Sequence, residues 1–100
     1  MNMQQMMAQA QKMQRELQKA LKALEEKEFV ISKGGAVTVK MYGSNQIISI
    51  TVDEDAFDKD NKEMVEELIT MTINEGLDQI AAEREAINEK ITGQRGGFGF

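Results

Sequence analysis

The stretch EFVISKGGAVTVKMYGSNQIISITV, residues 28–52, decides the fold. β-Branched and other apolar residues alternate with polar ones along it, and the alternation breaks at Lys33–Gly35 and again at Gly43–Asn45. Alternation with a period of two predicts strands, and the two breaks divide the stretch into three of them. Because the connections are short, the strands are predicted to form an antiparallel meander.

The predicted sheet has one apolar face and one wetter face. Residues two positions apart on a strand share a face. The apolar face is expected to carry Phe29, Ile31, Val37, Val39, Met41, Ile48, Ile50 and Val52. The reverse face is expected to carry Thr38, Lys40, Tyr42, Ser49 and Thr51.

A long helix is predicted before the sheet, over residues 3–26. Steps of three and four residues define a heptad seam along one side. The seam consists of Met3, Met6, Ala10, Met13, Leu17, Ala20 and Leu24. On the opposite side lies a basic stripe, Lys12, Arg15, Lys19 and Lys22, with spacings of three, four and three residues.

A second long helix is predicted after the sheet. The acidic loop DEDAFDKDN, residues 53–61, supplies its N-cap, for which Asp58 and Asp60 are the candidates. Apolar residues at helical spacing then run from Met64 to Ile91, and Gly93 ends the helix. The domain organisation is therefore a single domain over 1–92 and a flexible, glycine-rich tail over 93–100.

The helix lengths predict the overall shape. A helix of residues 3–26 is about 36 Å long at 1.5 Å per residue, whereas a strand of six residues is only about 20 Å long. Both helices therefore overhang the sheet, and their free ends can project as an antiparallel pair. A chain of 100 residues buries only a modest core, so association is expected, and a two-fold dimer would present two such arms.

The composition excludes several functional classes. The chain has no Cys and no His, which removes disulfides, thiolate and imidazole metal ligands and most catalytic bases. Nothing pairs its carboxylates with a nucleophile or pocket, so no enzyme, cofactor or small-molecule substrate is expected. No apolar run approaches the roughly 20 residues of a membrane span, and the N-terminal segment lacks the apolar block of a signal peptide. A cytoplasmic protein is predicted.

The charge is unevenly distributed along the chain. Residues 1–40 hold seven Lys or Arg against four Glu, residues 41–89 three against thirteen Asp or Glu, and the last eleven residues two against none. An extended polyanion would meet the two ends of the chain and avoid the middle. The cations that could meet such a polyanion are Lys12, Arg15, Lys19, Lys22, Lys90 and Arg95.

The sequence resembles the YbaB/EbfC family of nucleoid-associated proteins over nearly its whole length. The matching pieces, in order, are QAQKMQ (9–14), GGAVTVKMYG (34–43), ISITVD (48–53) and DNKEMVEELI (60–69), followed by Asn74. The resemblance implies an α+β subunit with the order α-β-β-β-α, and a tweezer-like homodimer with projecting helices. It also implies non-enzymatic binding of double-stranded DNA in the nucleoid of the bacterial cytoplasm, which makes the six cations named above the candidate DNA-binding residues.

The sequence departs from the family at Gly76, where a small helix former such as Ala is more usual. Glycine inside a helix costs about 1 kcal/mol relative to alanine. Close approach of another backbone would compensate for that cost, so Gly76 is expected to mark a crossing with the sheet or with a partner helix.

Other interpretations of the same residues remain open. The basic stripe could be only a solvated helix face. The N-terminal methionines could suggest a copper(I) site, but their heptad spacing favours a role as adaptable packing residues. The acidic loop superficially resembles a calcium loop, but it has Phe57 where an oxygen ligand belongs and no glycine at the sixth position, so capping and solubility explain it better. A different functional class is a prefoldin-like interaction or holdase protein whose methionine-rich helix tips grip clients. DNA binding through phosphates weakens with salt, whereas gripping of apolar clients survives it.

Overall fold

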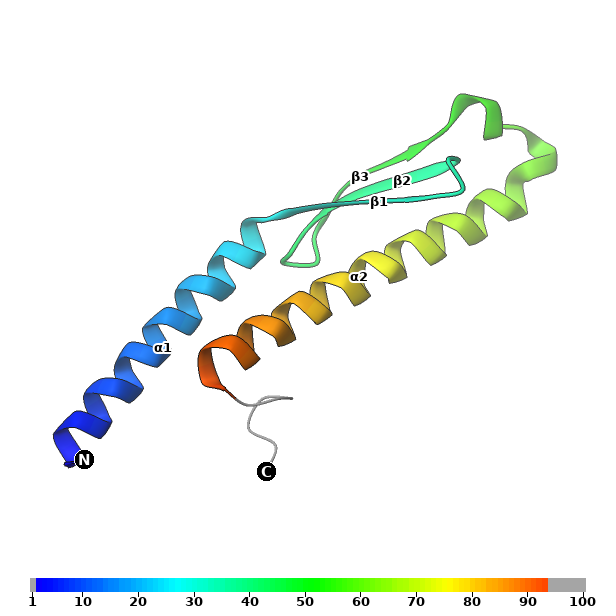
Figure 1. Ribbon diagram of the computed structural model, residues 1–100. Coiled ribbons are helices and arrows are strands. Elements are labelled where there is room, and N and C mark those ends of the chain that lie inside the picture. Colours follow the sequence, from blue (N-terminus) through cyan, green and yellow to red (C-terminus); the bar gives the residue numbers. More distant parts are fainter. Residues whose placement is uncertain (1, 94–100) are drawn as a thin grey trace.

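The structure is a computed structural model that describes residues 2–93 of the chain. Its order is α1 (Met3–Glu26), β1 (Glu28–Lys33), β2 (Val37–Tyr42), β3 (Ile47–Val52) and α2 (Lys62–Thr92), with 3-10 turns at Glu54–Ala56 and Lys59–Asn61 (Figure 1). The predicted α-β-β-β-α order is confirmed, α1 has the predicted bounds, and α2 ends before Gly93 as predicted. The molecule is elongated, 69 × 25 × 15 Å.

The sheet is the predicted antiparallel meander, with strand order β1-β2-β3. Ile31 pairs with Val39, and Val39 pairs in turn with Ile50, so these three share the apolar face as expected. A bulge shifts the register between Lys40 and Met41, with the result that Met41 lies opposite Ile47. The regular alternation predicted for Ile48 is therefore wrong at this end of β3, because a bulge adds one unpaired residue to a strand.

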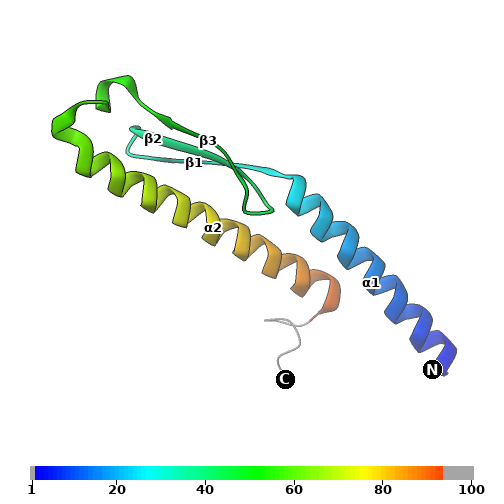
Figure 2. The same ribbon diagram turned by 180° about the vertical axis from the view of Figure 1, so that it is seen from behind.

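Helix α2 packs against β1 and β2, and the core lies between them (Figures 1 and 2). The buried core consists of Leu24, Phe29, Ile31, Val37, Val39, Met41 and Ile80. Gly76 is buried where α2 crosses the sheet, and a Cβ atom there would lie 2.5 Å from Sδ of Met41 and 3.0 Å from Cδ1 of Ile31. The prediction that Gly76 marks a crossing with the sheet is confirmed.

Strand β3 lies beside the region that α2 covers. Ile48 and Ile50 remain 39% and 44% exposed, although Ile50 is on the same sheet face as the fully buried Val39. The apolar sheet face predicted over all three strands is therefore buried within the chain only on β1 and β2. A single helix is too narrow to cover three strands spaced nearly 5 Å apart.

Helix α1 is joined to the rest of the molecule at its C-terminal end. The amide of Gly43 donates to the carbonyl oxygen of Lys27 (2.9 Å), and Nη2 of Arg84 donates to the carbonyl oxygen of Gly43 (3.2 Å). Nζ of Lys27 lies 2.6 Å from Oε1 of Glu83. Arg84 interrupts the apolar spacing of α2, and this contact explains why: its guanidinium ties α2 to the β2–β3 turn.

The start of α2 differs from the prediction. The carboxylate of Asp58 accepts a hydrogen bond from the amide of Asp60 (2.9 Å) and so caps the second 3-10 turn. Asn61 is the N-cap of α2 and makes no side-chain capping bond. Neither predicted aspartate caps α2, because the intervening 3-10 turn places both too early in the chain. At the other end Gly93 has φ 71° and ends α2 as predicted. The predicted tail from residue 94 onward lies outside the described residues.

Candidate nucleic-acid interface

The N-terminal part of α1 projects beyond the rest of the molecule. Asn2 starts the helix, because its Oδ1 accepts from the amide of Gln5 (2.8 Å) and Oε1 of Gln5 accepts from the amide of Asn2 (3.5 Å), forming a capping box. Every residue from Met3 to Glu16 is exposed, whereas Leu24, near the other end of α1, is buried in the core. We call residues 3–16 the arm. The predicted overhang of α1 is confirmed.

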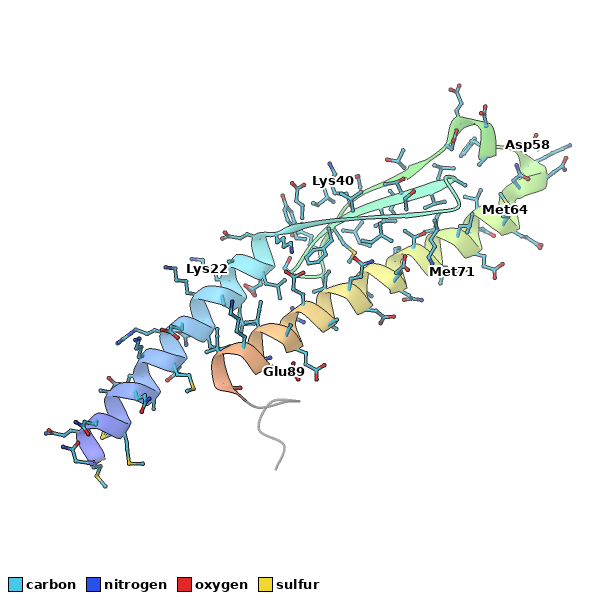
Figure 3. All side chains as sticks on the ribbon, in the orientation of Figure 1. Lys22, Lys40, Asp58, Met64, Met71 and Glu89 are labelled. Atoms are coloured by element: carbon cyan, nitrogen blue, oxygen red, sulfur yellow. The ribbon has the colours of Figure 1, made fainter. Side chains whose placement is uncertain are left out.

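The basic stripe runs along the arm and into the rest of α1. Lys12, Arg15, Lys19 and Lys22 are all exposed, and over residues 2–93 none of them makes an ion pair or a side-chain hydrogen bond. Their ten-residue span corresponds to about 15 Å of helix. Figure 3 shows Lys22 on the side of α1 that faces away from α2. Four cations are thus free to meet an anion along one side of a projecting helix.

Of the other two predicted residues, Lys90 belongs to the far end of the second helix. Lys90 is exposed in the last turn of α2, where a cation also interacts favourably with the helix dipole. The last turns of α2 lie beside α1, so Lys90 is at the same end of the molecule as the basic stripe (Figures 1 and 2). Arg95 lies outside the described residues.

Lys40 lies on the same side of the molecule as the basic stripe and was not among the predicted DNA-binding residues. It is exposed on β2 between the buried Val39 and Met41, and Figure 3 shows it on the side of the sheet away from α2, as Lys22 is on α1. The alternation of β2 does place Lys40 on the wetter face. The sequence did not indicate that the wetter face of the sheet and the basic stripe of α1 lie on the same side of the molecule.

Two further lysines are occupied by carboxylates and are poor candidates for phosphate contacts. Lys27 pairs with Glu83 at 2.6 Å, and Lys33 pairs with Glu75 at 3.2 Å. These pairs connect the sheet region to α2. Because a phosphate would have to displace an existing partner, Lys27 and Lys33 are less available than the basic stripe.

All five acidic residues of the loop lie at the opposite end of the molecule from the arm. Asp53, Glu54, Asp55, Asp58 and Asp60 surround the two 3-10 turns, which form the end of the molecule where β3 passes into α2 (Figure 1). The elongated subunit therefore has a cationic arm at one end and a carboxylate cluster at the other. Such a distribution orients a molecule in the field of a polyanion.

Among the helices of residues 2–93, none has the length and apolarity needed to cross a bilayer.

Comparison with known proteins gives consistent matches over nearly the whole chain. The profile of the YbaB/EbfC DNA-binding family matches residues 1–95. A "Nucleoid-associated protein" of Clostridium novyi (strain NT) is 48% identical over 96 residues, covering 93% of this chain and 82% of the relative. Another of the same description, from Enterococcus faecalis (strain ATCC 700802 / V583), is 39% identical and covers 97% of this chain and 94% of the relative.

The fold also has a match among solved structures. The crystal structure of an uncharacterized protein from Helicobacter pylori superimposes with a TM-score of 0.74 and covers 93% of this chain and 99% of that chain. Sequence identity to that protein is 18%, so the match concerns the fold alone. Together with the family profile, the two relatives favour DNA binding over the prefoldin-like alternative.

Proposed function

Because this chain belongs to the YbaB/EbfC DNA-binding family, we propose that it binds double-stranded DNA as a homodimer, mainly through phosphate contacts from its helical arms. The observation that carries the proposal is the basic stripe: four exposed cations along one side of a projecting helix, with no carboxylate partner among residues 2–93. Such contacts hold and position a protein on DNA without reading its sequence. Lys90 would add a contact from the second helix, Lys40 one from the sheet, and Arg95, which follows the second helix in the sequence, a further one.

The uncovered part of the sheet supports the homodimer. Ile48 and Ile50 on β3 are exposed, and Ile73 and Leu77 on α2 are half-buried. Glu75 on α2 faces β1 through its ion pair with Lys33, so Ile73 and Leu77, on another side of the helix, border β3. We call these four apolar residues the β3 surface. In an isologous dimer the same surface of a second copy would cover it.

The proposed role is architectural and not enzymatic. Relatives of this chain carry the description "Nucleoid-associated protein", and the same location, the nucleoid within the cytoplasm, is proposed here. A dimer would present two basic stripes, one from each arm. Contact with two stretches of duplex, or with one stretch from two sides, would then require no cofactor and no small-molecule substrate.

The test is a mobility-shift titration of the full chain with duplex DNA across a series of salt concentrations. Phosphate contacts release condensed counterions, so log affinity should fall linearly with log salt. Duplexes of unrelated sequence should bind with similar affinity. If the chain fails to bind duplex at low salt but captures unfolded apolar clients at high salt, the DNA proposal is wrong and the holdase alternative is favoured.

A further inference from the structure

Both ends of the elongated subunit carry apolar side chains that stay exposed among residues 2–93. At the arm end these are Met3, Met6 and Met13, here called the methionine stripe, which continue the heptad seam of α1 past its contact with α2. Their exposed fractions are 77%, 57% and 36%, whereas Leu24 on the same seam is only 3% exposed. Methionine side chains are flexible and adapt to the shape of the surface that they meet. The stripe is therefore suited to docking on another apolar surface.

The opposite end of the subunit has an apolar pocket. It lies between the two 3-10 turns and the first turns of α2, and it has a volume of about 350 Å³ and an almost entirely apolar surface. Ala56, Phe57 and Val65 line it, and Asp58 and Glu66 also contribute. Phe57 is 81% exposed. An exposed apolar surface rimmed by polar residues marks an interaction site.

The methionine stripe and the pocket cannot meet within one chain. The 3-10 turns lie at one end of a molecule 69 Å long, and the arm projects from the other end (Figure 1). The sheet and the continuous helix α1, from Met3 to Glu26, keep the two ends apart. A contact between these two surfaces therefore joins two copies of the chain.

Charge selects the pocket, and not a second arm, as the partner of the methionine stripe. Residues 3–22 hold four cations and one carboxylate, so two arms repel each other. Residues 53–66, around the pocket, hold seven carboxylates and two lysines, so they attract an arm. The basic stripe lies across the helix from the methionine stripe, a distance of about 10 Å, which is close to the Debye length at physiological salt. The attraction therefore steers the approach, and the contact itself is apolar.

We propose that the methionine stripe of one copy docks in the apolar pocket of a second copy, with Met6 against the ring of Phe57. Methionine sulfur makes favourable contacts with aromatic rings. The small Ala10, between Met6 and Met13 on the seam, lets the backbone of the arm come close to the pocket. The basic stripe then points away from the pocket. Neither DNA nor the β3 surface takes part in this contact, so this proposal and the proposed function can fail independently.

The first test uses the absence of native cysteine. Two proteins of different size tags are mixed under mild oxidation: one carries Ala10→Cys, and the other carries Lys59→Cys at a residue that also lines the pocket. The matched control for the arm is Ala8→Cys, at an exposed residue on the basic side of the same helix. A disulfide requires Cα atoms within about 7 Å, so Ala10→Cys should form the mixed disulfide about fivefold faster than Ala8→Cys does. Equal rates would overturn the proposal. Disulfides between two Ala10→Cys arms that form faster than mixed ones would place arm against arm and overturn it as well.

The second test changes the contact and its electrostatic steering. Phe57→Ala, added to the Lys59→Cys protein, removes the ring that meets methionine sulfur and should slow the mixed disulfide about fivefold. The control Val30→Ala shortens a side chain that is 61% exposed on the sheet face away from α2, and it should leave the rate unchanged. Added salt should slow the mixed disulfide and speed disulfides between two arms, because it screens both the attraction and the repulsion. A rate that Phe57→Ala leaves unchanged would overturn docking in the pocket. A rate that salt leaves unchanged or raises would overturn the choice of partner by charge.

Discussion

Gly43 lies against the backbone of Leu24, so closely that a Cβ atom on Gly43 would be 1.9 Å from the carbonyl oxygen of Leu24 and 2.7 Å from its carbonyl carbon. The last turn of α1 crosses the β2–β3 turn at this point. The same glycine accepts a hydrogen bond from Arg84 of α2 and donates one to Lys27. Three elements thus meet at a residue without a side chain, and the direction of the arm depends on that junction.

Replacement of Gly43 by Ala should strongly destabilise the fold. The new methyl group would meet backbone atoms, which cannot move aside as the end of a side chain can. Overpacking of this kind costs typically about 1–3 kcal/mol, and here the upper part of that range is expected. Urea denaturation followed by circular dichroism gives the free energy of unfolding. The neighbouring exposed residue offers a control, since Ser44→Ala should change stability by no more than about 0.5 kcal/mol. Equal stabilities for the two variants would show that α1 is not fixed at this crossing.

Gly76→Ala should also destabilise the protein, although alanine favours helices. The gain in helix propensity is about 1 kcal/mol. The new methyl group, however, would lie 2.5 Å from Sδ of the fully buried Met41. Overpacking of this kind costs about 1–3 kcal/mol. We expect a net loss of about 1 kcal/mol. The control is Ala82→Gly, at an exposed position of α2, because it changes the free energy of unfolding through helix propensity alone. A more stable Gly76→Ala variant would show that Met41 moves aside freely.

The elements that the sequence predicted well are those specified by local patterns. Alternation and glycine turns defined the three strands, and heptad spacing defined α1 from Met3 to Glu26. The basic stripe was also predicted as a continuous exposed face, because three- and four-residue spacing alone determines which helical residues share a side. Gly76 was assigned to a crossing on energetic grounds, and the contact with Met41 agrees with that reasoning.

What the sequence did not predict depends on distant parts of the chain. The bulge opposite Met41, the exposure of Ile50 and the contact of Arg84 with Gly43 follow from how α2 lies across two of the three strands. Periodicity gives the face of a strand but not which strands a helix covers. The placement of Lys40 beside the basic stripe has the same origin, because it depends on the orientation of α1 relative to the sheet.

The proposed dimer can be tested at the β3 surface. Ile50→Asp should shift the protein from dimer to monomer in sedimentation velocity at micromolar concentration, because burying an unpaired carboxylate in an interface costs several kcal/mol. Since Ile50 is 44% exposed within the subunit, the monomer should stay folded by circular dichroism. Val30→Asp is the matched control: Val30 is also a β-branched strand residue, 61% exposed, but on the face away from α2. A parent protein that sediments as a folded monomer contradicts the dimer itself. Dissociation by Val30→Asp alone would move the interface to the opposite face.

The last prediction concerns the basic stripe and asks whether it contacts phosphates or only solvent. A dimer presents at most eight stripe residues, and about four to eight phosphate contacts give a slope of log affinity against log salt near −4 to −7, at roughly 0.9 per neutralised phosphate. Changing Arg15 and Lys19 together to Ala removes up to four of these contacts, so the slope should become shallower by about 2 to 4. Affinity should fall similarly for all duplexes, because phosphate contacts carry no sequence information. Stability should barely change, since both side chains are exposed.

A second double variant, Lys59→Ala with Lys62→Ala, removes the same charge from the acidic end of the molecule. Its net charge equals that of the Arg15 and Lys19 variant, so a general effect of charge would weaken both proteins equally. If binding depends on the stripe, only the α1 variant loses affinity and slope, while the control keeps the slope of the parent. Should the α1 variant instead bind as tightly as the parent with an unchanged slope, the stripe is a solvated face. The phosphate contacts must then come from Lys40, Lys90 and Arg95, and substitution of those three residues becomes the deciding measurement.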